Sequence, residues 1–420
     1  MKKWTWAVAA AASALVVAGC GGGGGGTAST NNTGFSQLVS FGDSLSDIGT
    51  YNVGTVAAVG GGKFTVNSPT AKNWTQLIAA QYNVPTPCPA QTGLANLLPS
   101  LTSAGFVGAA TQNFSSCRNY AQGSSRVTVQ YAPYSAAVQN YIVGATVQGG
   151  GTLAQGQSAA ASAGFALGLS AVPVVTQMNT HLTNVGGAYT GKELVTIIAG
   201  ANDVFMNLNG INAVATAVAG PSQSTIQGAV LGATFAGWTN PNQYASPSAS
   251  SVSTAQAAAF AAVQQAATDL VTDIKTLVLA KGATHVVVGN LPDISQTPYG
   301  ISLGAQGAAL TQQLTLAFNS TLAAGLNGLS GVLLVDLYTQ GQSETANPVQ
   351  YGLTNVTTPA CSTTSAANPL QGSSLTCTAA STIAGDTSHY QYADTVHPTP
   401  YGYQLIAQFM TLKLIAAGWQ

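Results

Sequence analysis

The chain has 420 residues, which is enough for one large domain or two small ones. Charged residues make up only 5% of it and the net charge is −1, so the sequence has no basic patch of the kind that binds nucleic acid. Hydrophobic residues make up 46%, which suffices for a sizeable core, and the sparse charge favours a neutral or weakly charged small molecule as the substrate.

The N-terminus predicts an export signal over residues 1–19. Lys2 and Lys3 precede an apolar stretch, 4–17, that is too short to span a membrane. The segment ends Val-Ala-Gly-Cys, which resembles a bacterial lipobox, so we expect cleavage before Cys20 and a lipid on its thiol. The alternative is an ordinary signal peptide with an incidental cysteine.

A glycine-rich stretch over residues 20–34 predicts a flexible tether ahead of a folded domain that spans residues 35–420. Glycine follows Cys20, and by resemblance to sorted lipoproteins this favours the outer membrane. We therefore expect an exported protein that is held at the outer membrane or cell surface, or is released. Its contact with the membrane would be the lipid anchor on Cys20.

Within the domain, short apolar runs rich in β-branched residues predict parallel strands that helices cover on both faces. These runs are residues 37–41, 194–199, 284–289 and 332–337, with a further short strand expected near 117–120. Helical patterns cover residues 255–279, 312–326 and 403–415. Strands that alternate with helices indicate a doubly wound α/β domain.

Besides Cys20 the chain has four cysteines, and an even number in an exported protein predicts two disulfide bonds. Three pairings are possible. Cys88–Cys117 and Cys361–Cys377 are favoured, because each would close a loop rich in Pro, Ser or Thr. No Cys-x-x-Cys spacing occurs, so we do not expect a zinc site.

Two short motifs at opposite ends of the domain carry a serine, a histidine and a carboxylate. Phe-Gly-Asp-Ser-Leu-Ser-Asp, at 41–47, follows the first predicted strand and places Ser44 where a helix would begin. Asp-Thr-Val-His-Pro-Thr, at 394–399, puts Asp394 three residues before His397. A single turn then lets the carboxylate bond one ring nitrogen while the other faces Ser44. Such a set activates a hydroxyl as a nucleophile.

These motifs and two others resemble the sequence blocks of the GDSL, or SGNH, hydrolases. Gly-Asp-Ser-Leu at 42–45 is similar to the nucleophile block, and Asp-Thr-Val-His at 394–397 is similar to the block of the acid and base. Asn-Tyr-Ala-Gln-Gly at 119–123 and Gly-Ala-Asn-Asp at 200–203 are similar to the two oxyanion-hole blocks. The four occur in the family's order. Asp47 and the His-Pro-Thr ending most resemble the bacterial phospholipase, lecithinase and hemolysin-type esterases.

The resemblance implies an SGNH-hydrolase-like (flavodoxin-like) three-layer α/β/α sandwich with a central parallel sheet. It implies that Ser44, His397 and Asp394 are the nucleophile, base and acid. It also implies an oxyanion hole made by the amides of Ser44 and Gly123 and by the Asn202 side chain. The expected protein is a monomer that hydrolyses a small-molecule or lipid ester through an acyl-enzyme, with no metal or organic cofactor. An acyltransferase with the same nucleophile and a non-catalytic surface lipoprotein are the alternatives.

Other polar residues near these blocks have structural interpretations. We expect Asp43 and Asp203 to bond backbone turns around the site. Asp47 would cap a helix that follows Ser44. Arg126 is one of few cations, and it would lie either at the surface or against an anionic group of the substrate.

Two stretches exceed what a small domain of this type needs, one near residues 134–168 and one near 207–254. The first is rich in Gly, Ala, Ser and Gln, and the second contains Gly-Pro, Asn-Pro and a serine-rich run. Both lie beside blocks of the candidate site. Each is therefore either a lid or binding surface for an acyl chain, or a surface insertion with no role.

Overall fold

The structure is a computed structural model that describes residues 34–95, 105–129 and 171–419, together with Thr102, Thr152 and Gln155. The chain divides into the units 1–32 and 33–420, and every element named below belongs to the second. The predicted leader, the lipidation at Cys20 and nearly all of the insertion near 134–168 lie outside the described residues. Among the helices that are described, none has the length and apolar character needed to cross a membrane.

Four parallel strands form the central sheet, in the order β1-β4-β5-β6. Their bounds are β1 (Gln37–Gly42), β4 (Glu193–Ile198), β5 (Val286–Gly289) and β6 (Val332–Val335). All four predicted strands are therefore confirmed, with ends that differ by at most two residues. The segment expected as a further strand runs parallel to β1 as a single bridge, because Ser40 N donates to Arg118 O and Tyr120 N donates to Ser40 O.

The strands are apolar on both sides, and this explains why helices cover both faces of the sheet. Successive side chains of a strand point to opposite faces. In β1, Leu38 belongs to one buried cluster while Val39 and Phe41 belong to the other. Leu194 and Val195 of β4 divide in the same way. A sheet of this kind is stable only between two layers of helices.

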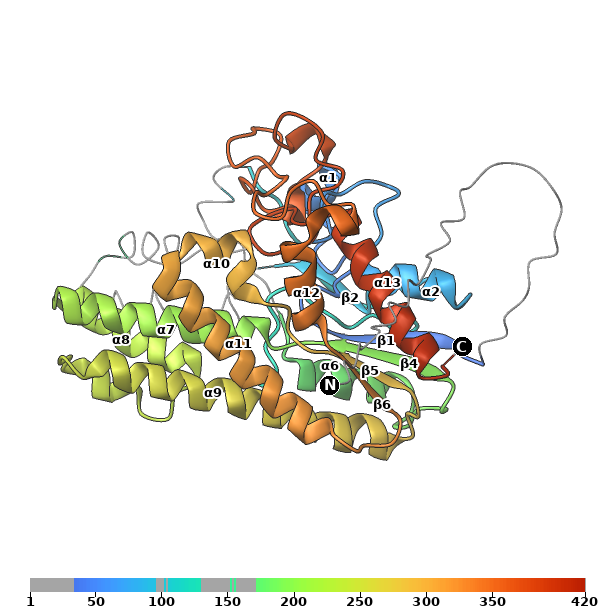
Figure 1. The fold of residues 1–420 in the computed structure, drawn as a ribbon, viewed down its shortest axis with the longest axis horizontal. Coiled ribbons are helices and arrows are strands. Elements are labelled where there is room, and N and C mark those ends of the chain that lie inside the picture. Colours follow the sequence, from blue (N-terminus) through green and yellow to red (C-terminus); the bar gives the residue numbers. More distant parts are fainter. Residues whose placement is uncertain are drawn as a thin grey trace, which may run out of the picture. The chain divides into compact units, whose positions relative to one another are not determined.

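Figure 1 shows the resulting three layers. One face of the sheet packs against α2 (Trp74–Gln81) and α13 (Pro400–Ala416). The other face packs against α6 (Val174–Asn184), α7 (Ala201–Ala219), α9 (Ser251–Asp273) and α11 (Gly304–Leu326). The predicted α/β/α sandwich with a central parallel sheet is confirmed.

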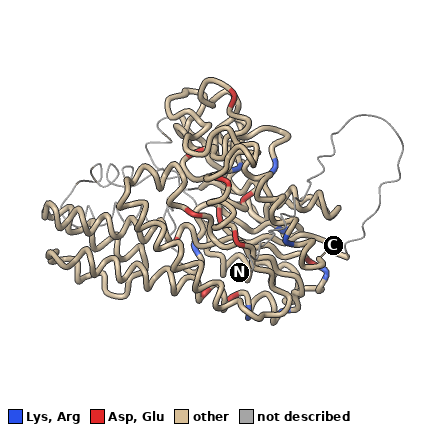
Figure 2. The backbone as a smooth tube through the Cα atoms, viewed as in Figure 1, with Lys and Arg blue, Asp and Glu red and all other residues tan. Residues whose placement is uncertain are grey.

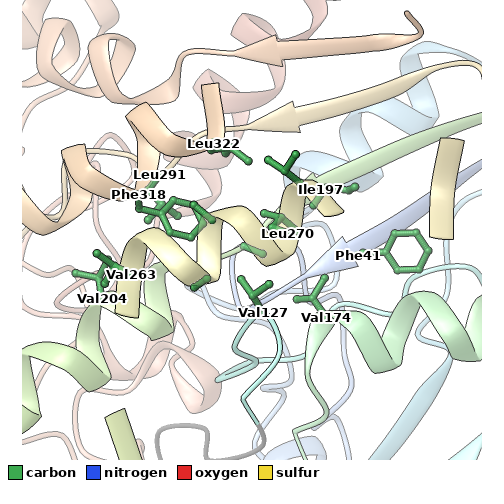
Figure 3. Close-up of a cluster of buried hydrophobic side chains, with 14 of the residues drawn as sticks. Phe41, Val127, Val174, Ile197, Val204, Val263, Leu270, Leu291, Phe318 and Leu322 are labelled. Atoms are coloured by element: carbon green, nitrogen blue, oxygen red, sulfur yellow. The ribbon is translucent and has the colours of Figure 1, made fainter. Parts of the chain in front are cut away.

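The larger core lies between the sheet and the second layer of helices. Figure 3 shows Phe318 of α11 and Leu270 of α9 in this cluster, together with Phe41 and Ile197 from the sheet. All four side chains are fully buried. Burial of each such side chain contributes about 1.5–3 kcal/mol to the free energy of folding, so this cluster is a main source of the stability of the sheet.

The three predicted helices are confirmed, and each begins before its expected start. The helix expected over 312–326 is the second half of α11, which begins at Gly304. The helix expected over 255–279 is α9, which continues as a π-helical turn over Ile274–Val278. The one expected over 403–415 is α13, which begins at Pro400 because the Thr399 hydroxyl accepts from Gly402 N.

The stretch near 207–254 is helical. It forms most of α7, then α8 (Gln223–Ala236), the 3₁₀ turn Pro241–Ala245 and the start of α9. Residues 204–268 contain no Lys, Arg, Asp or Glu. The helices α7, α8 and α9 are accordingly almost entirely tan, the colour of uncharged residues, in Figure 2.

The remaining elements are short. They are α1 (Gly54–Ala58), α10 (Pro298–Ser302), α12 (Leu337–Ala346) and the antiparallel pair β2 (Gln91–Leu94) and β3 (Ala109–Asn113). Both favoured disulfides are present, Cys88–Cys117 and Cys361–Cys377. The first lies at the segment that pairs with β1, and the second closes a loop that precedes α13.

Candidate active site

The chain reverses direction immediately after β1. Gly42 has a φ of +146°, and a Cβ atom there would lie 2.1 Å from Ile198 O, so only glycine fits. Ser46 N and Asp47 N both donate to Asp43 O, which closes a tight turn around Ser44. The helix expected after Ser44 is absent, and the next helix, α1, begins only at Gly54.

Ser44, His397 and Asp394 lie in one hydrogen-bonded chain, as their motifs predict. His397 Nε2 is 2.8 Å from Ser44 Oγ, and His397 Nδ1 is 2.8 Å from Asp394 Oδ2. Asp394 Oδ1 also accepts from the amides of Val396 and His397, which forms the expected turn. The ring of Phe64 packs on the imidazole, with 4.9 Å between the ring centroids.

The surroundings of Asp394 keep its carboxyl ionised. Burial by itself would raise the pKa of Asp394. The charge of His397 and the hydrogen bonds from His397, Ser374 and Val396 outweigh burial and hold this pKa well below its usual range. An ionised Asp394 favours a proton on His397 Nδ1, which leaves Nε2 to accept the proton of Ser44.

Asn202 lies beside the nucleophile at the start of α7. Gly200 precedes this helix with a φ of +116°, and a Cβ atom there would lie 2.2 Å from the Phe318 ring. Asn202 Nδ2 donates one hydrogen bond to Ser125 O at 2.9 Å. The amide has a second hydrogen, and Asn202 lines the same cavity as Ser44.

Gly123 is placed differently from its predicted role as an oxyanion donor. Its amide donates to Asp47 Oδ2 at 2.9 Å, so this N–H is already engaged. The structure therefore gives no support to Gly123 as a donor in this arrangement. The amides of Ser44 and Ser124, by contrast, have no hydrogen-bond partner in the described part of the chain.

Two buried aspartates organise the turn that carries the nucleophile. Asp47 does not cap a helix, because its Oδ1 accepts from the amides of Gly49 and Thr50. Asp43 Oδ1 accepts from Leu45 N, which agrees with its expected role in a turn. Burial raises the pKa of Asp43 to about 7 and that of Asp47 to about 6, and the backbone hydrogen bonds oppose this only in part.

Arg126 is neither exposed nor part of the cavity lining, so both interpretations of it from the sequence are wrong. Its side chain is 2% exposed, and its Nε lies 2.8 Å from Asp203 Oδ1. The guanidinium also donates to Phe235 O and Ala236 O at the end of α8. Asp203 bonds a backbone segment, as expected, because its Oδ2 accepts from Val127 N.

Gln177 of α6 is a functional residue that sequence reasoning missed. Its Oε1 accepts from Gly42 N at 2.9 Å, and its Nε2 donates to Gly42 O at 2.8 Å. The same Nε2 lies 3.0 Å from Ser125 Oγ, next to the carbonyl that holds Asn202. Gln177 therefore joins the nucleophile turn to the segment that positions Asn202. No sequence signal marks it, because glutamine is ordinarily a surface residue.

A cavity opens beside Ser44 and His397. Its walls are largely apolar and include Leu45, Phe205, Ile294, Leu337, Val396 and Ile406. The carboxylates of Asp43, Asp293 and Glu344 also line it, and the described lining holds no Lys or Arg. The cavity therefore suits an apolar group and disfavours an anionic one.

Comparison with curated proteins finds no match. Residues 38–410 match the profile of the family described as GDSL-like Lipase/Acylhydrolase, and this range includes all four sequence blocks. Membership of this family supports ester hydrolysis as the general activity. The chain belongs to the GDSL-like lipase/acylhydrolase family.

Proposed function

We propose that the protein hydrolyses carboxylic esters of lipid or short-chain acyl groups through a covalent acyl-enzyme on Ser44. One observation carries this proposal, the hydrogen-bonded chain from Asp394 through His397 to Ser44 at the wall of an apolar cavity. A serine, a base and a carboxylate in this order form a nucleophile of the Ser-His-Asp kind.

The reaction follows from this geometry. His397 Nε2 accepts the proton as Ser44 Oγ attacks the ester carbonyl, and Asp394 stabilises the imidazolium that forms. His397 then donates the proton to the leaving alcohol. Water attacks the acyl-enzyme with His397 as the base, which releases the acid and restores Ser44.

When Ser44 attacks, the carbonyl oxygen of the ester becomes negatively charged. Stabilising this charge requires N–H groups that have no other hydrogen-bond partner. The amide of Ser44 and the second hydrogen of Asn202 Nδ2 meet this condition. The amide of Ser124 is a third candidate, because it has no hydrogen-bond partner in the described ranges. Gly123 would contribute only if its amide left Asp47. Loss of one such donor lowers kcat by about 10²–10³-fold in serine hydrolases.

The cavity supports an apolar acyl group as the part of the substrate that binds beside Ser44. Its walls are mostly apolar, and its described lining has no Lys or Arg that could pair with an anionic group. This agrees with a neutral ester. A phospholipase-type substrate would then place its phosphate away from this cavity.

A series of p-nitrophenyl esters from short to long acyl chains tests the proposal. The wild-type protein should hydrolyse at least one member, and Ser44→Ala should not. Analysis of the products with an added alcohol separates the hydrolase from an acyltransferase, since a transferase forms a new ester. If neither protein turns over any ester while both are folded, the proposal is wrong.

We also propose that the protein is exported and that Cys20 carries the lipid that holds it at a membrane. The signal-like residues 1–19, the lipobox-like ending and the glycine-rich tether support this. Paired cysteines are typical of oxidising compartments. The mass of the mature N-terminus tests it, because a lipidated Cys20 differs from a free N-terminus. A Cys20→Ala variant should lose the added mass.

A further inference from the structure

The loop that the Cys361–Cys377 disulfide closes touches both the acid and the base of the site. Ser374 lies in this loop and is fully buried. Its amide donates to Asp394 Oδ2 at 3.0 Å, and its Oγ lies 3.3 Å from His397 Nδ1. Asp394 and His397 therefore have a partner that their own motif does not supply.

The first end of the loop is bonded directly to the acid–base turn. Cys361 N donates to Ala393 O at 2.8 Å. Ala393 immediately precedes Asp394, and its own amide donates to His397 O at 2.7 Å. The disulfide then links Cys361 to Cys377, which lies three residues after Ser374. A movement of either cysteine would therefore reach the acid–base turn.

The second end of the loop is held by Asn67, a buried residue far away in the sequence. Asn67 Nδ2 lies 2.8 Å from Ser374 O and 3.1 Å from Cys377 O. Asn67 N donates to Cys377 O at 2.8 Å. Phe64, three residues before Asn67, packs on the His397 ring. The segment that holds the loop through Asn67 therefore also contacts the imidazole through Phe64.

We infer that the Cys361–Cys377 loop is a positioning element for the site and that Ser374 is the positioning residue through which it acts. The loop holds Ser374 against Asp394 and His397, and this contact sets the orientation of the imidazole toward Ser44. The inference rests on the proposed function, because it assigns a role within that reaction. A displacement of about 1 Å in a reacting group can lower a rate by about 100-fold.

The second disulfide provides a matched control. Cys88 O accepts from Asn119 N, and Asn119 Nδ2 donates to Ser46 O. The Cys88–Cys117 bond is therefore tied to the segment beside β1 and to the turn around Ser44, and within the described residues neither cysteine bonds Asp394 or His397. Loss of either disulfide removes a covalent loop, but among the described residues of the two loops only Ser374 bonds both the acid and the base.

The sharpest test is Ser374→Ala, which removes the hydroxyl and keeps the amide donor. We expect kcat to fall by about tenfold while KM changes by less than about twofold. The acid limb of the pH profile of kcat/KM should also shift, because the hydroxyl that is removed lies against the Nδ1 atom of the base. Wild-type kcat and an unchanged pH profile would overturn the inference.

A second readout does not depend on turnover. The chain has only four histidines, so NMR of ¹⁵N-histidine-labelled protein can resolve the His397 Nδ1 signal. Asp394→Asn identifies this signal. In Ser374→Ala it should shift while the other three histidines keep their positions. If the signal is identical in the wild type and in Ser374→Ala, Ser374 does not act on His397.

The disulfide arm compares Cys361→Ser/Cys377→Ser with Cys88→Ser/Cys117→Ser at a temperature where circular dichroism shows that both are folded. The first pair should shift the His397 Nδ1 signal, and the second should leave it in place, because only the first pair bonds the acid–base turn. Equal shifts would contradict the role of the loop. If the first pair does not fold, Ser374→Ala decides. Failure of the proposed function is distinct, because the wild type would then hydrolyse no ester and Ser44→Ala would behave identically.

Discussion

Arg126→Met should destabilise the fold without affecting substrate binding. Arg126 and Asp203 form a buried ion pair between the segment after Gly123 and the start of α7. Methionine is similar in length to the arginine side chain but offers no charge and no donor. The Asp203 carboxylate would remain buried, and in the described part of the chain the Val127 amide would be its only remaining donor.

The expected magnitude follows from what the substitution leaves behind. The Phe235 and Ala236 carbonyls lose their guanidinium donors, and an unsatisfied buried polar group costs about 1–3 kcal/mol. A buried carboxylate also loses its counter-charge, and breaking such a pair from one side costs about 3–5 kcal/mol. These effects overlap, so we expect the free energy of unfolding to fall by about 3–5 kcal/mol.

Urea unfolding of the wild type, Arg126→Met and Arg126→Met/Asp203→Asn measures this effect. The double variant should be more stable than Arg126→Met, because it removes the unpaired buried charge. KM for neutral esters should be unchanged in both, since Arg126 does not line the cavity. If Arg126→Met unfolds within about 0.5 kcal/mol of the wild type, the reasoning is refuted.

Three further variants test the site and the core. Asn202→Ala should lower kcat by about 10²–10³-fold in steady-state ester hydrolysis, and an unchanged kcat would exclude Asn202 from the oxyanion hole. Burial raises the pKa of Asp43 to about 7, so the folded state binds more protons than the unfolded chain from about pH 4 to about pH 7, and stability falls as the pH rises through this window. Urea unfolding at several pH values should show that Asp43→Asn flattens this fall, and an equal slope would contradict the assignment. Phe318→Ala should reduce the free energy of unfolding by about 3–5 kcal/mol, because the side chain is fully buried, and chemical denaturation measures the loss.

The layers of the fold and the contact between Asp394 and His397 could be predicted because their signals are local, whereas Ser44, 353 residues before His397, was joined to them by the resemblance of the sequence blocks. Each central strand is a short apolar run, and such a run implies a sheet that is covered on both faces. Asp394 and His397 are three residues apart, so one turn brings them together whatever the rest of the chain does. The favoured disulfide pairing, in which each bond closes a loop rich in Pro, Ser or Thr, is also confirmed.

The errors arise where side chains bond partners that are distant in the sequence or compete with regular structure. The helix expected after Ser44 does not form, because Asp43 and Asp47 accept from nearby amides and stabilise a turn instead. Asp47 also takes the Gly123 amide, 76 residues away, which the block pattern alone does not reveal. Arg126 likewise finds its partner 77 residues away.

Positioning residues were the hardest to find. Gln177 and Ser374 are ordinary polar residues in sequence terms, one in a helix and one in a serine-rich loop. Their importance depends on contacts with Gly42 and Asp394 that only the packed structure brings about. A sequence pattern identifies groups that react, whereas the groups that orient them are defined by three-dimensional neighbours.

The most direct test of the central claim is to label the nucleophile covalently. A fluorophosphonate probe reacts with an activated serine, and mass spectrometry of the peptides locates the adduct. We predict one adduct, on Ser44, which is absent in Ser44→Ala and forms far more slowly in His397→Ala. A folded wild-type protein that remains unlabelled, or an adduct on a different serine that persists in Ser44→Ala, would contradict the assignment of Ser44 as the nucleophile.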